Sequence, residues 1–180
     1  MSHEDDTVGG KTLWLLRHAK ASLTHGHATD HDRTLEPRGQ RAATLIGAYL
    51  VQRGARPEFA LCSSARRAIE TLERVVAQLP HTPSVVIDED LYLASPETLL
   101  ERLRRLDEDA ESAIVVGHNP GIADFARRLA RRGDSDALER LRSHFPTGAL
   151  AEIRFRAMHW GEIDFGTGVL GRYSAPKELV

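Results

Sequence analysis

The sequence is poor in cysteine, in aromatic residues and in long apolar runs. Its single cysteine, Cys62, excludes an intramolecular disulfide framework and a cysteine-rich zinc module. No apolar run approaches the roughly 20 residues that a membrane-spanning helix needs. The N-terminus, MSHEDDTVGGK, is acidic and polar, which is not typical of a secretory signal. We therefore expect a soluble protein with no membrane partner, most simply a cytoplasmic one.

Neither sign of charge is in clear excess. Twenty-four Lys and Arg residues stand against 26 Asp and Glu residues, a net charge of −2, so no global basic field attracts nucleic acid. A chain of 180 residues suits one domain with one buried core. We predict a loose N-terminal tail over residues 1–11 and a single domain over 12–180. We expect this domain to be a monomer.

Short apolar runs alternate with helical patterns along most of the chain. Four runs are typical of buried strands: 12–16, 59–62, 84–87 and 113–117. Four helical stretches follow them, beginning at Pro37, at Ser63 or Ser64, at Ser95-Pro96 and just after Asn119-Pro120. This alternation predicts an α/β fold with a mostly parallel sheet.

The remaining segments are less regular. Residues 19–36 show no period, which favours a long loop. Residues 149–156 alternate between apolar and polar side chains, as in a strand with one buried face. A weaker strand is predicted within 168–174.

Charged and nucleophilic side chains follow three of the predicted strands. Arg17-His18 ends the first strand, Arg66-Arg67 follows the second, and His118 follows the fourth. Each alone is more often a structural or solvated residue, but in open α/β sheets ligands bind at this edge. Arginine forks and helix N-termini fit phosphate oxygens, and a histidine can act as a nucleophile. With no carboxylate pair fixed by spacing, the pattern predicts metal-free phosphoryl transfer.

Three segments at these junctions resemble the histidine phosphatase superfamily, whose members are phosphoglycerate mutase-like. Leu16-Arg17-His18-Ala19-Lys20 is similar to its Arg-His-Gly/Ala signature. Residues 63–71 (Ser-Ser-Ala-Arg-Arg-Ala-Ile-Glu-Thr) resemble its second motif, Ser-Pro-x-x-Arg-Ala-x-Gln-Thr, and place Arg67 on the motif's arginine. Residues 115–120 resemble its third motif, which surrounds a second histidine, here His118. The substitutions in this chain, Ala19 for Gly, Ser64 for Pro and Glu70 for Gln, remove no charge expected in the pocket.

The nearest branch is that of the SixA-like phosphohistidine phosphatases. Their further pattern, Asp-x-x-Arg-x-Leu-x-x-x-Gly, is placed here on Asp32-Arg33-Thr34-Leu35 and Gly39 with a shortened first gap. Leu91-Tyr92-x-Ala94-Ser95 and Pro176-Lys177 fit the same branch. The resemblance runs from about residue 12 to the end of the chain.

The resemblance implies a three-layer α/β sandwich with helices on both faces of the sheet. It also implies catalysis without metal or cofactor: His18 would form a covalent phosphohistidine while Arg17, Arg67 and His118 bind the phosphoryl oxygens. The implied substrate is phosphohistidine in a partner protein.

The general acid is the least defined part of the implied site. Many superfamily members carry a Glu on an insertion after the third strand, but here the connection over 88–94 is short. Glu89 and Asp90 are the candidates, although both are typical of solvated loop acids. The same short connection predicts an open site.

Other functions fit parts of the sequence. A small-molecule phosphomonoesterase or mutase of the same superfamily, or a non-catalytic phosphate-binding module, would use the same arginines. A tyrosine-phosphatase loop from Cys62 would need Arg at position 68, where Ala68 stands. Gly10-Lys11-Thr12 imitates the end of a P-loop but precedes its strand. His25, His27 and His31 could bind a metal, although a surface cluster is more typical of such a loop.

Overall fold

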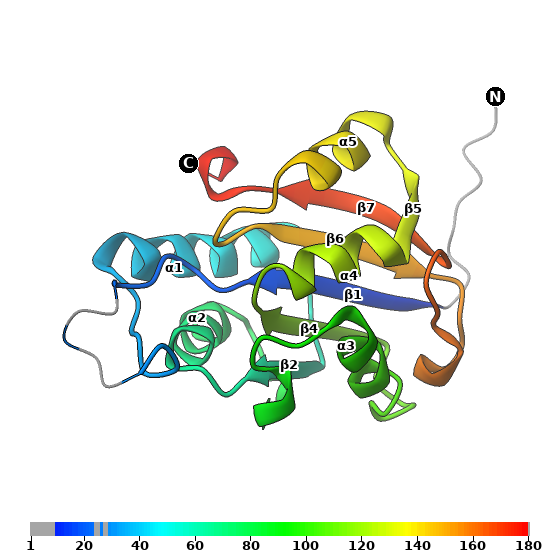
Figure 1. Cartoon of the computed structure of the whole chain (residues 1–180). Coiled ribbons are helices and arrows are strands. Elements are labelled where there is room, and N and C mark those ends of the chain that lie inside the picture. The colour runs from blue at the N-terminus through cyan, green and yellow to red at the C-terminus, as the bar shows by residue number, and fades with distance from the viewer. Residues whose placement is uncertain (1–9, 24–25, 27–28, 180) are drawn as a thin grey trace.

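A single seven-stranded sheet organises the protein. The computed structural model describes residues 10–23, 26 and 29–179. Its strands are β1 (Lys11–Arg17), β2 (Phe59–Ser63), β3 (Ser84–Asp88), β4 (Ser112–Gly117), β5 (Ala130–Gly133), β6 (Leu150–Phe155) and β7 (Gly168–Ser174). They lie side by side in the order β3-β2-β4-β1-β6-β7-β5, so β1 is the central strand (Figure 1).

Helices cover both faces of this sheet. The α-helices are α1 (Pro37–Gln52), α2 (Arg66–Val76), α3 (Pro96–Leu103), α4 (Gly121–Leu129) and α5 (Ser135–Ser143). Helices α1 and α2 pack on one face, and α3 and α4 pack on the other (Figure 1). The three-layer α/β sandwich expected from the sequence is therefore confirmed. In the described part of the chain, no helix has the length and apolar character needed to cross a membrane.

Most neighbouring strands run parallel, as predicted. Strands β1, β4, β2 and β3 pair in parallel, and so do β5 and β7. Strand β6 runs antiparallel to both β1 and β7. The carboxyl ends of β1, β2 and β4 consequently meet at one edge of the sheet, where a ligand is expected in this class of fold.

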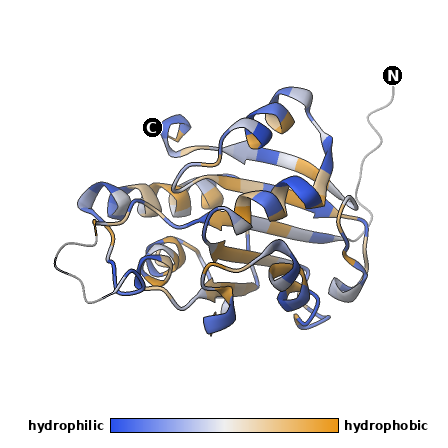
Figure 2. Cartoon of the chain, in the orientation of Figure 1, coloured by the Kyte–Doolittle hydropathy of each residue, from blue (hydrophilic) through white to orange (hydrophobic). Residues whose placement is uncertain are grey.

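The central strand is buried on both of its faces. Leu13 and Leu15 point into the layer formed with α3 and α4, while Trp14 and Leu16 point into the layer formed with α1 and α2. A strand buried in this way has a continuous apolar sequence rather than an alternating one. Figure 2 shows the apolar colouring concentrated on the inner strands and on the helix faces that meet them.

The structure differs from the sequence-based prediction at the start of β1 and again over residues 130–143. Lys11, placed in the tail, is the first residue of β1; its buried ammonium donates to the carbonyls of Glu108 and Ala110, each at 2.8 Å. Strand β5 and helix α5 were not predicted. Three of the four residues of β5 are exposed, and α5 buries only Leu138 and Leu141, so neither has a clear apolar period.

Helix α2 also begins differently from the prediction. Its N-cap is Ala65, with no side-chain cap. Neither Ser63 nor Ser64 caps the helix, because their hydroxyls bond to histidines. The capping of α3 by Ser95, followed by Pro96 in the first turn, is confirmed.

A close approach of two backbones holds the loop after β1. Gly39, in the first turn of α1, lies so near Lys20 that a Cβ added to it would stand 2.1 Å from the Lys20 carbonyl oxygen. Lys20 is two residues beyond His18, so this contact fixes the chain just after the carboxyl end of β1.

We predict that Gly39→Ala lowers the free energy of unfolding by about 1–3 kcal/mol, because the new methyl group meets backbone that has to shift. Urea unfolding of the variant and of the wild type measures this difference. Gly161→Ala is the matched control, since nothing lies within 4 Å of its added Cβ, and it should change stability by less than about 0.5 kcal/mol. Equal stability of the two variants would contradict the close approach.

Candidate active site

The register between β1 and β4 brings two histidines together. Arg17 pairs with Gly117 as the last residues of these parallel strands, so the next residue on each strand is a histidine. The backbone N–H of His18 donates to the Gly117 carbonyl at 3.0 Å. The rings of His18 and His118 lie 5.1 Å apart between centroids, and both residues are buried.

The first turn of α2 adds an arginine to this pair. The Arg67 Nε–H donates to His18 Nε2 at 3.3 Å, and the Arg67 side chain is 4% exposed. Its neighbour Arg66 points into solvent and pairs with Glu70 at 2.9 Å. The structure therefore gathers His18, Arg67 and His118 at one sheet edge, in the register that the motif predicted.

Arg17 lies at the same edge of the sheet and, within the described ranges of the chain, has one unpaired hydrogen-bond donor. Its Nη1 donates to the Phe145 carbonyl at 3.0 Å, an oxygen that also accepts from Asn119 Nδ2 at 2.8 Å. Its Nε is buried and has no hydrogen-bond partner among the described residues. Burial and the charge of Arg67 lower the pKa of Arg17. An unpaired, buried guanidinium donor is what an anion-binding site requires.

One ring nitrogen of His18 is held and the other is available. Nδ1–H donates to the Ala19 carbonyl at 2.8 Å, which assigns the proton to Nδ1 and the lone pair to Nε2. Sequence analysis could not name this partner. Burial lowers the pKa of His18 to about 4; the Ala19 hydrogen bond opposes this shift, and the charge of Arg67 adds to it. His18 is consequently neutral near pH 7, with Nε2 suited to nucleophilic attack.

Among the residues that the structure describes, His118 has one paired and one unpaired ring nitrogen. Its Nε2 lies 2.7 Å from Ser63 Oγ, which also accepts from the Ala65 N–H at 3.2 Å. When the Ser63 hydroxyl donates to Nε2, the ring proton lies on Nδ1. His118 Nδ1 is buried without a hydrogen-bond partner in the described chain. Burial, followed by the neighbouring His18 and Arg67, lowers the pKa of His118 to about 3.

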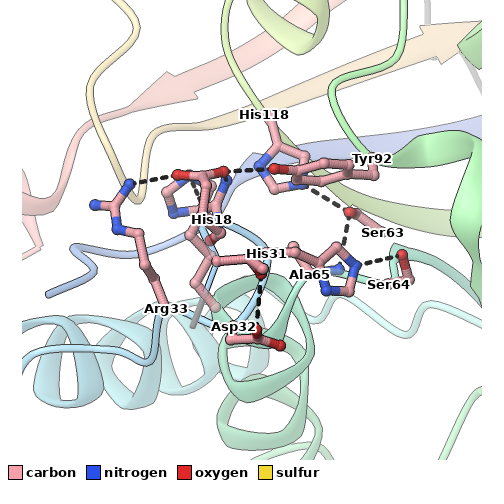
Figure 3. Close-up of polar contacts among 12 residues, drawn as sticks. His18, His31, Asp32, Arg33, Ser63, Ser64, Ala65, Tyr92 and His118 are labelled. Atoms are coloured by element: carbon pink, nitrogen blue, oxygen red, sulfur yellow. Dashed lines mark hydrogen bonds and ion pairs between the residues drawn. The ribbon is translucent and has the colours of Figure 1, made fainter. Parts of the chain in front are cut away.

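A carboxylate missed by the sequence analysis faces Arg67. Oδ2 of Asp30 lies 3.0 Å from Arg67 Nη2 and accepts from the Tyr92 hydroxyl at 2.5 Å, while Oδ1 lies 2.9 Å from Arg33 Nη1. The Asp30 backbone carbonyl also accepts from Arg67 Nη1 at 2.7 Å. Figure 3 shows Arg33 and Tyr92 converging on this point beside His18 and His118.

The placement of the Asp-x-x-Arg pattern on Asp32 was therefore wrong. Asp32 accepts from the Thr29 hydroxyl at 2.7 Å and makes no contact with Arg67. Asp30 stands three residues before Arg33 and fits the pattern without a shortened gap. The spacing alone would have identified it.

Tyr92 comes from the short connection after β3 and forms part of the wall of the site. Its ring packs edge-on against His118 and His31, with centroid distances of 5.5 and 4.9 Å, and Arg67 lies over it at 5.9 Å. His31 Nε2 bonds to Ser64 Oγ at 2.9 Å. His25 and His27 lie outside the described residues, and within the described ranges no group of three potential ligands is arranged to hold a metal.

Comparison with known proteins agrees with this geometry. A family model for the histidine phosphatase superfamily (branch 1) matches residues 13–92. An uncharacterized protein of Mycobacterium tuberculosis is 36% identical over 164 residues, covering 90% of this chain and all of the relative. The structure of a candidate phosphohistidine phosphatase, SixA of Nakamurella multipartitia, superposes with a TM-score of 0.80 at 30% identity, covering 93% of this chain and 97% of that one. The chain belongs to the SixA-like branch of the histidine phosphatase superfamily.

A second SixA, from Agrobacterium tumefaciens, is 27% identical with a TM-score of 0.76, and the match covers 92% of this chain and 99% of that one. Two residues of the present histidine phosphatase that depart from the superfamily's second motif form hydrogen bonds to the segment that follows β1. Ser64, in the place of Pro, bonds to His31, and Glu70, in the place of Gln, accepts from the Leu35 N–H at 2.8 Å. These contacts hold the segment that carries Asp30 against α2 and the turn that precedes it.

The acids proposed as proton donors lie elsewhere. Asp90 pairs with Arg102 of α3, and Glu89 is exposed. Within the described part of this histidine phosphatase, neither makes a contact with His18, Arg67 or His118. The carboxylate that stands beside Arg67 is that of Asp30.

The lowered pKa values predict that both site histidines stay neutral in the free protein well below pH 6. A ¹⁵N-detected NMR titration should show His18 and His118 protonating near pH 4 and pH 3, with His18→Ala used to assign the signals. Because the unfolded chain takes up these protons nearer 6.5, the free energy of unfolding should fall as the pH drops from there toward 4. Inorganic phosphate should raise the pKa of His118. A His18 ring protonated at pH 6 would contradict the burial argument.

Proposed function

We propose that this protein is a metal-independent phosphatase that forms a covalent phosphohistidine on His18 and removes phosphate from phosphohistidine in proteins. The observation that carries the proposal is the state of His18. Its Nδ1–H is held by the Ala19 carbonyl, and its Nε2 lone pair faces Arg67 in a buried site. A phosphate-binding module has no need of such a nucleophile.

The proposed first step transfers the phosphoryl group to the enzyme. His18 Nε2 attacks phosphorus in line, the bond from phosphorus to the leaving atom breaks, and the leaving atom takes its electron pair. The lone pair of Nε2 accepts the Arg67 Nε–H in the free protein, so the incoming phosphoryl oxygens take over this donor. Water then cleaves the phosphorus–nitrogen bond and restores His18.

Positive charge and free donors supply the stabilisation that a metal supplies elsewhere. Charge in a loose phosphoryl transition state is spread over the three equatorial oxygens. We assign their binding to Arg17, Arg67 and His118. The Arg17 Nε–H and His118 Nδ1 support this assignment, because among the described residues both are buried without a hydrogen-bond partner. Nδ1 is a donor in the tautomer whose Nε2 accepts from Ser63.

A phosphohistidine substrate suits a site without an enzymic acid. The imidazole of the substrate can be protonated before it leaves, whereas an alkoxide needs a donor such as the Glu89 or Asp90 that lie outside this site. The names of the similar proteins from Nakamurella multipartitia and Agrobacterium tumefaciens, both phosphohistidine phosphatase candidates, support the same substrate class.

The proposal is tested by comparing kcat/KM for a phosphohistidine protein with kcat/KM for 3-phosphoglycerate and for a phosphoserine peptide, all in EDTA. We expect the phosphohistidine protein to be preferred, and a quenched reaction to show acid-labile, alkali-stable phosphate on the enzyme. His18→Ala should show neither turnover nor labelling. A preference for either ester would overturn the substrate assignment alone, whereas turnover by His18→Ala would overturn the covalent mechanism.

We further predict that Arg67→Lys is nearly as damaging as Arg67→Ala, because a point charge cannot reproduce the fork of a guanidinium. Loss of one preorganised donor costs roughly 10²–10³ in rate, about 3–4 kcal/mol. Steady-state kcat measures this loss. Arg66→Ala is the matched control, since Arg66 faces solvent, and it should retain activity. Loss of activity in the Arg66 variant with activity kept in the Arg67 variants would contradict the assignment.

A further inference from the structure

The Asp30 carboxylate lies nearer the surface than the groups that hold the phosphoryl oxygens. Its side chain is 43% exposed, whereas that of Arg67 is 4% exposed, and His18 and His118 are buried beneath. The Arg67 guanidinium links the buried histidine to the exposed carboxylate, because its Nε–H donates to His18 and its Nη2 donates to Asp30. In-line attack puts the leaving group on the side of phosphorus opposite His18 Nε2. Because His18 is buried and Asp30 is exposed, a protein substrate that enters from solvent brings its leaving group to the exposed side, where Asp30 lies.

The carboxylate is fixed in place and keeps room for one more hydrogen bond. An ionised carboxylate offers about four acceptor positions. Arg67, Arg33 and Tyr92 occupy three of them, and the Asp30 side chain is partly exposed to solvent. Hydrogen bonds from Tyr92 and Arg33 hold the pKa of Asp30 well below its usual range, so the group is an anion at every working pH.

We propose that Asp30 determines the specificity of the reaction: its carboxylate accepts a hydrogen bond from the protonated ring of the substrate histidine and disfavours leaving groups that become anionic. This inference rests on the proposed phosphohistidine phosphatase function and names the residue that selects the substrate class.

A protonated ring is the better leaving group in the transfer step, because it leaves as neutral imidazole and not as an imidazolate anion. His18 Nε2 forms its bond to phosphorus, the bond from phosphorus to the substrate nitrogen breaks, and that nitrogen takes the electron pair. With a proton already on its far nitrogen, the ring departs as neutral imidazole. An anion within about 4–6 Å favours this protonated form and raises its pKa. Asp30 would act through that far N–H, with no proton passing to the enzyme.

The same carboxylate acts against phosphate esters. The oxygen of a serine or sugar phosphate gains negative charge as its bond to phosphorus breaks, and a nearby anion raises the energy of that state. With a phosphohistidine substrate, Asp30 thus compensates for the missing enzymic acid. With a phosphate ester, it raises the energy of the transition state.

The test is Asp30→Asn, which keeps the shape of the side chain and removes its charge. Two small probes, phosphoimidazole and para-nitrophenyl phosphate, report the two leaving-group classes. We expect the ratio of their kcat/KM values to fall about 10- to 100-fold at pH 8, as a loss of roughly one to two pKa units in the substrate ring requires. In the plot of kcat/KM for phosphoimidazole against pH, the decline on the alkaline side should move to lower pH by the same amount, about one to two pH units. Asp32→Asn, two residues away and bonded to Thr29, is the matched control and should keep the wild-type ratio.

A merely structural role for Asp30 gives a different result. If Asp30 only positioned Arg67, Asp30→Asn would lower kcat/KM for both probes alike, raise the inhibition constant of inorganic phosphate and leave the ratio and the pH of the alkaline-side decline unchanged. That outcome would overturn the inference while wild-type preference for phosphohistidine kept the proposed function standing. A wild-type enzyme that prefers the ester would overturn both.

Discussion

The parallel pairing of β1 with β4 is the constraint on which the site depends. Arg17 pairs with Gly117, and each strand ends at that point, so His18 and His118 leave neighbouring strands side by side. A slip of one residue would turn every side chain of β1 to the other face of the sheet. The buried Leu13, Leu15 and Leu16 make such a slip costly, because each would enter the wrong core layer. Packing of the apolar core therefore sets the distance between the His18 and His118 rings.

The charges around these rings serve two purposes at once. Burial first, and then the charges of Arg67 and Arg17, lower the pKa of His18 and so keep its ring neutral. The same two cations provide the field that attracts a phosphate dianion. Among the described residues, the Arg17 Nε and His118 Nδ1 have no hydrogen-bond partner, at a cost of about 1–3 kcal/mol for each buried polar group. A bound oxyanion removes that cost, so phosphate binding and fold stability are linked through the same donors.

Much of this arrangement could be predicted from the sequence, because its signals are local. The apolar runs located the four parallel strands, and three short motifs located His18, Arg67 and His118. Strand β5 and helix α5 escaped prediction because exposed residues dominate them and their apolar contacts come from distant elements. The role of Ser63 also escaped, since a serine before a helix is usually a cap, and its hydroxyl is drawn instead to a histidine 55 residues away.

Asp30 and Tyr92 show what a loop can contribute when its ends are fixed. They lie 62 residues apart and meet through a hydrogen bond, although neither belongs to a long helix or strand. Gly39 lets α1 approach the Lys20 carbonyl, and Gly121 lets α4 approach the Ala94 carbonyl, where an added Cβ would stand only 1.8 Å away.

These two contacts hold the chain two residues after His18 and two residues after Tyr92. Fixed by α4 at Ala94, the short connection over 88–95 places Tyr92 against His118 and within hydrogen-bond distance of Asp30. Close backbone packing thus positions Tyr92 and Asp30, as strand register positions His18 and His118.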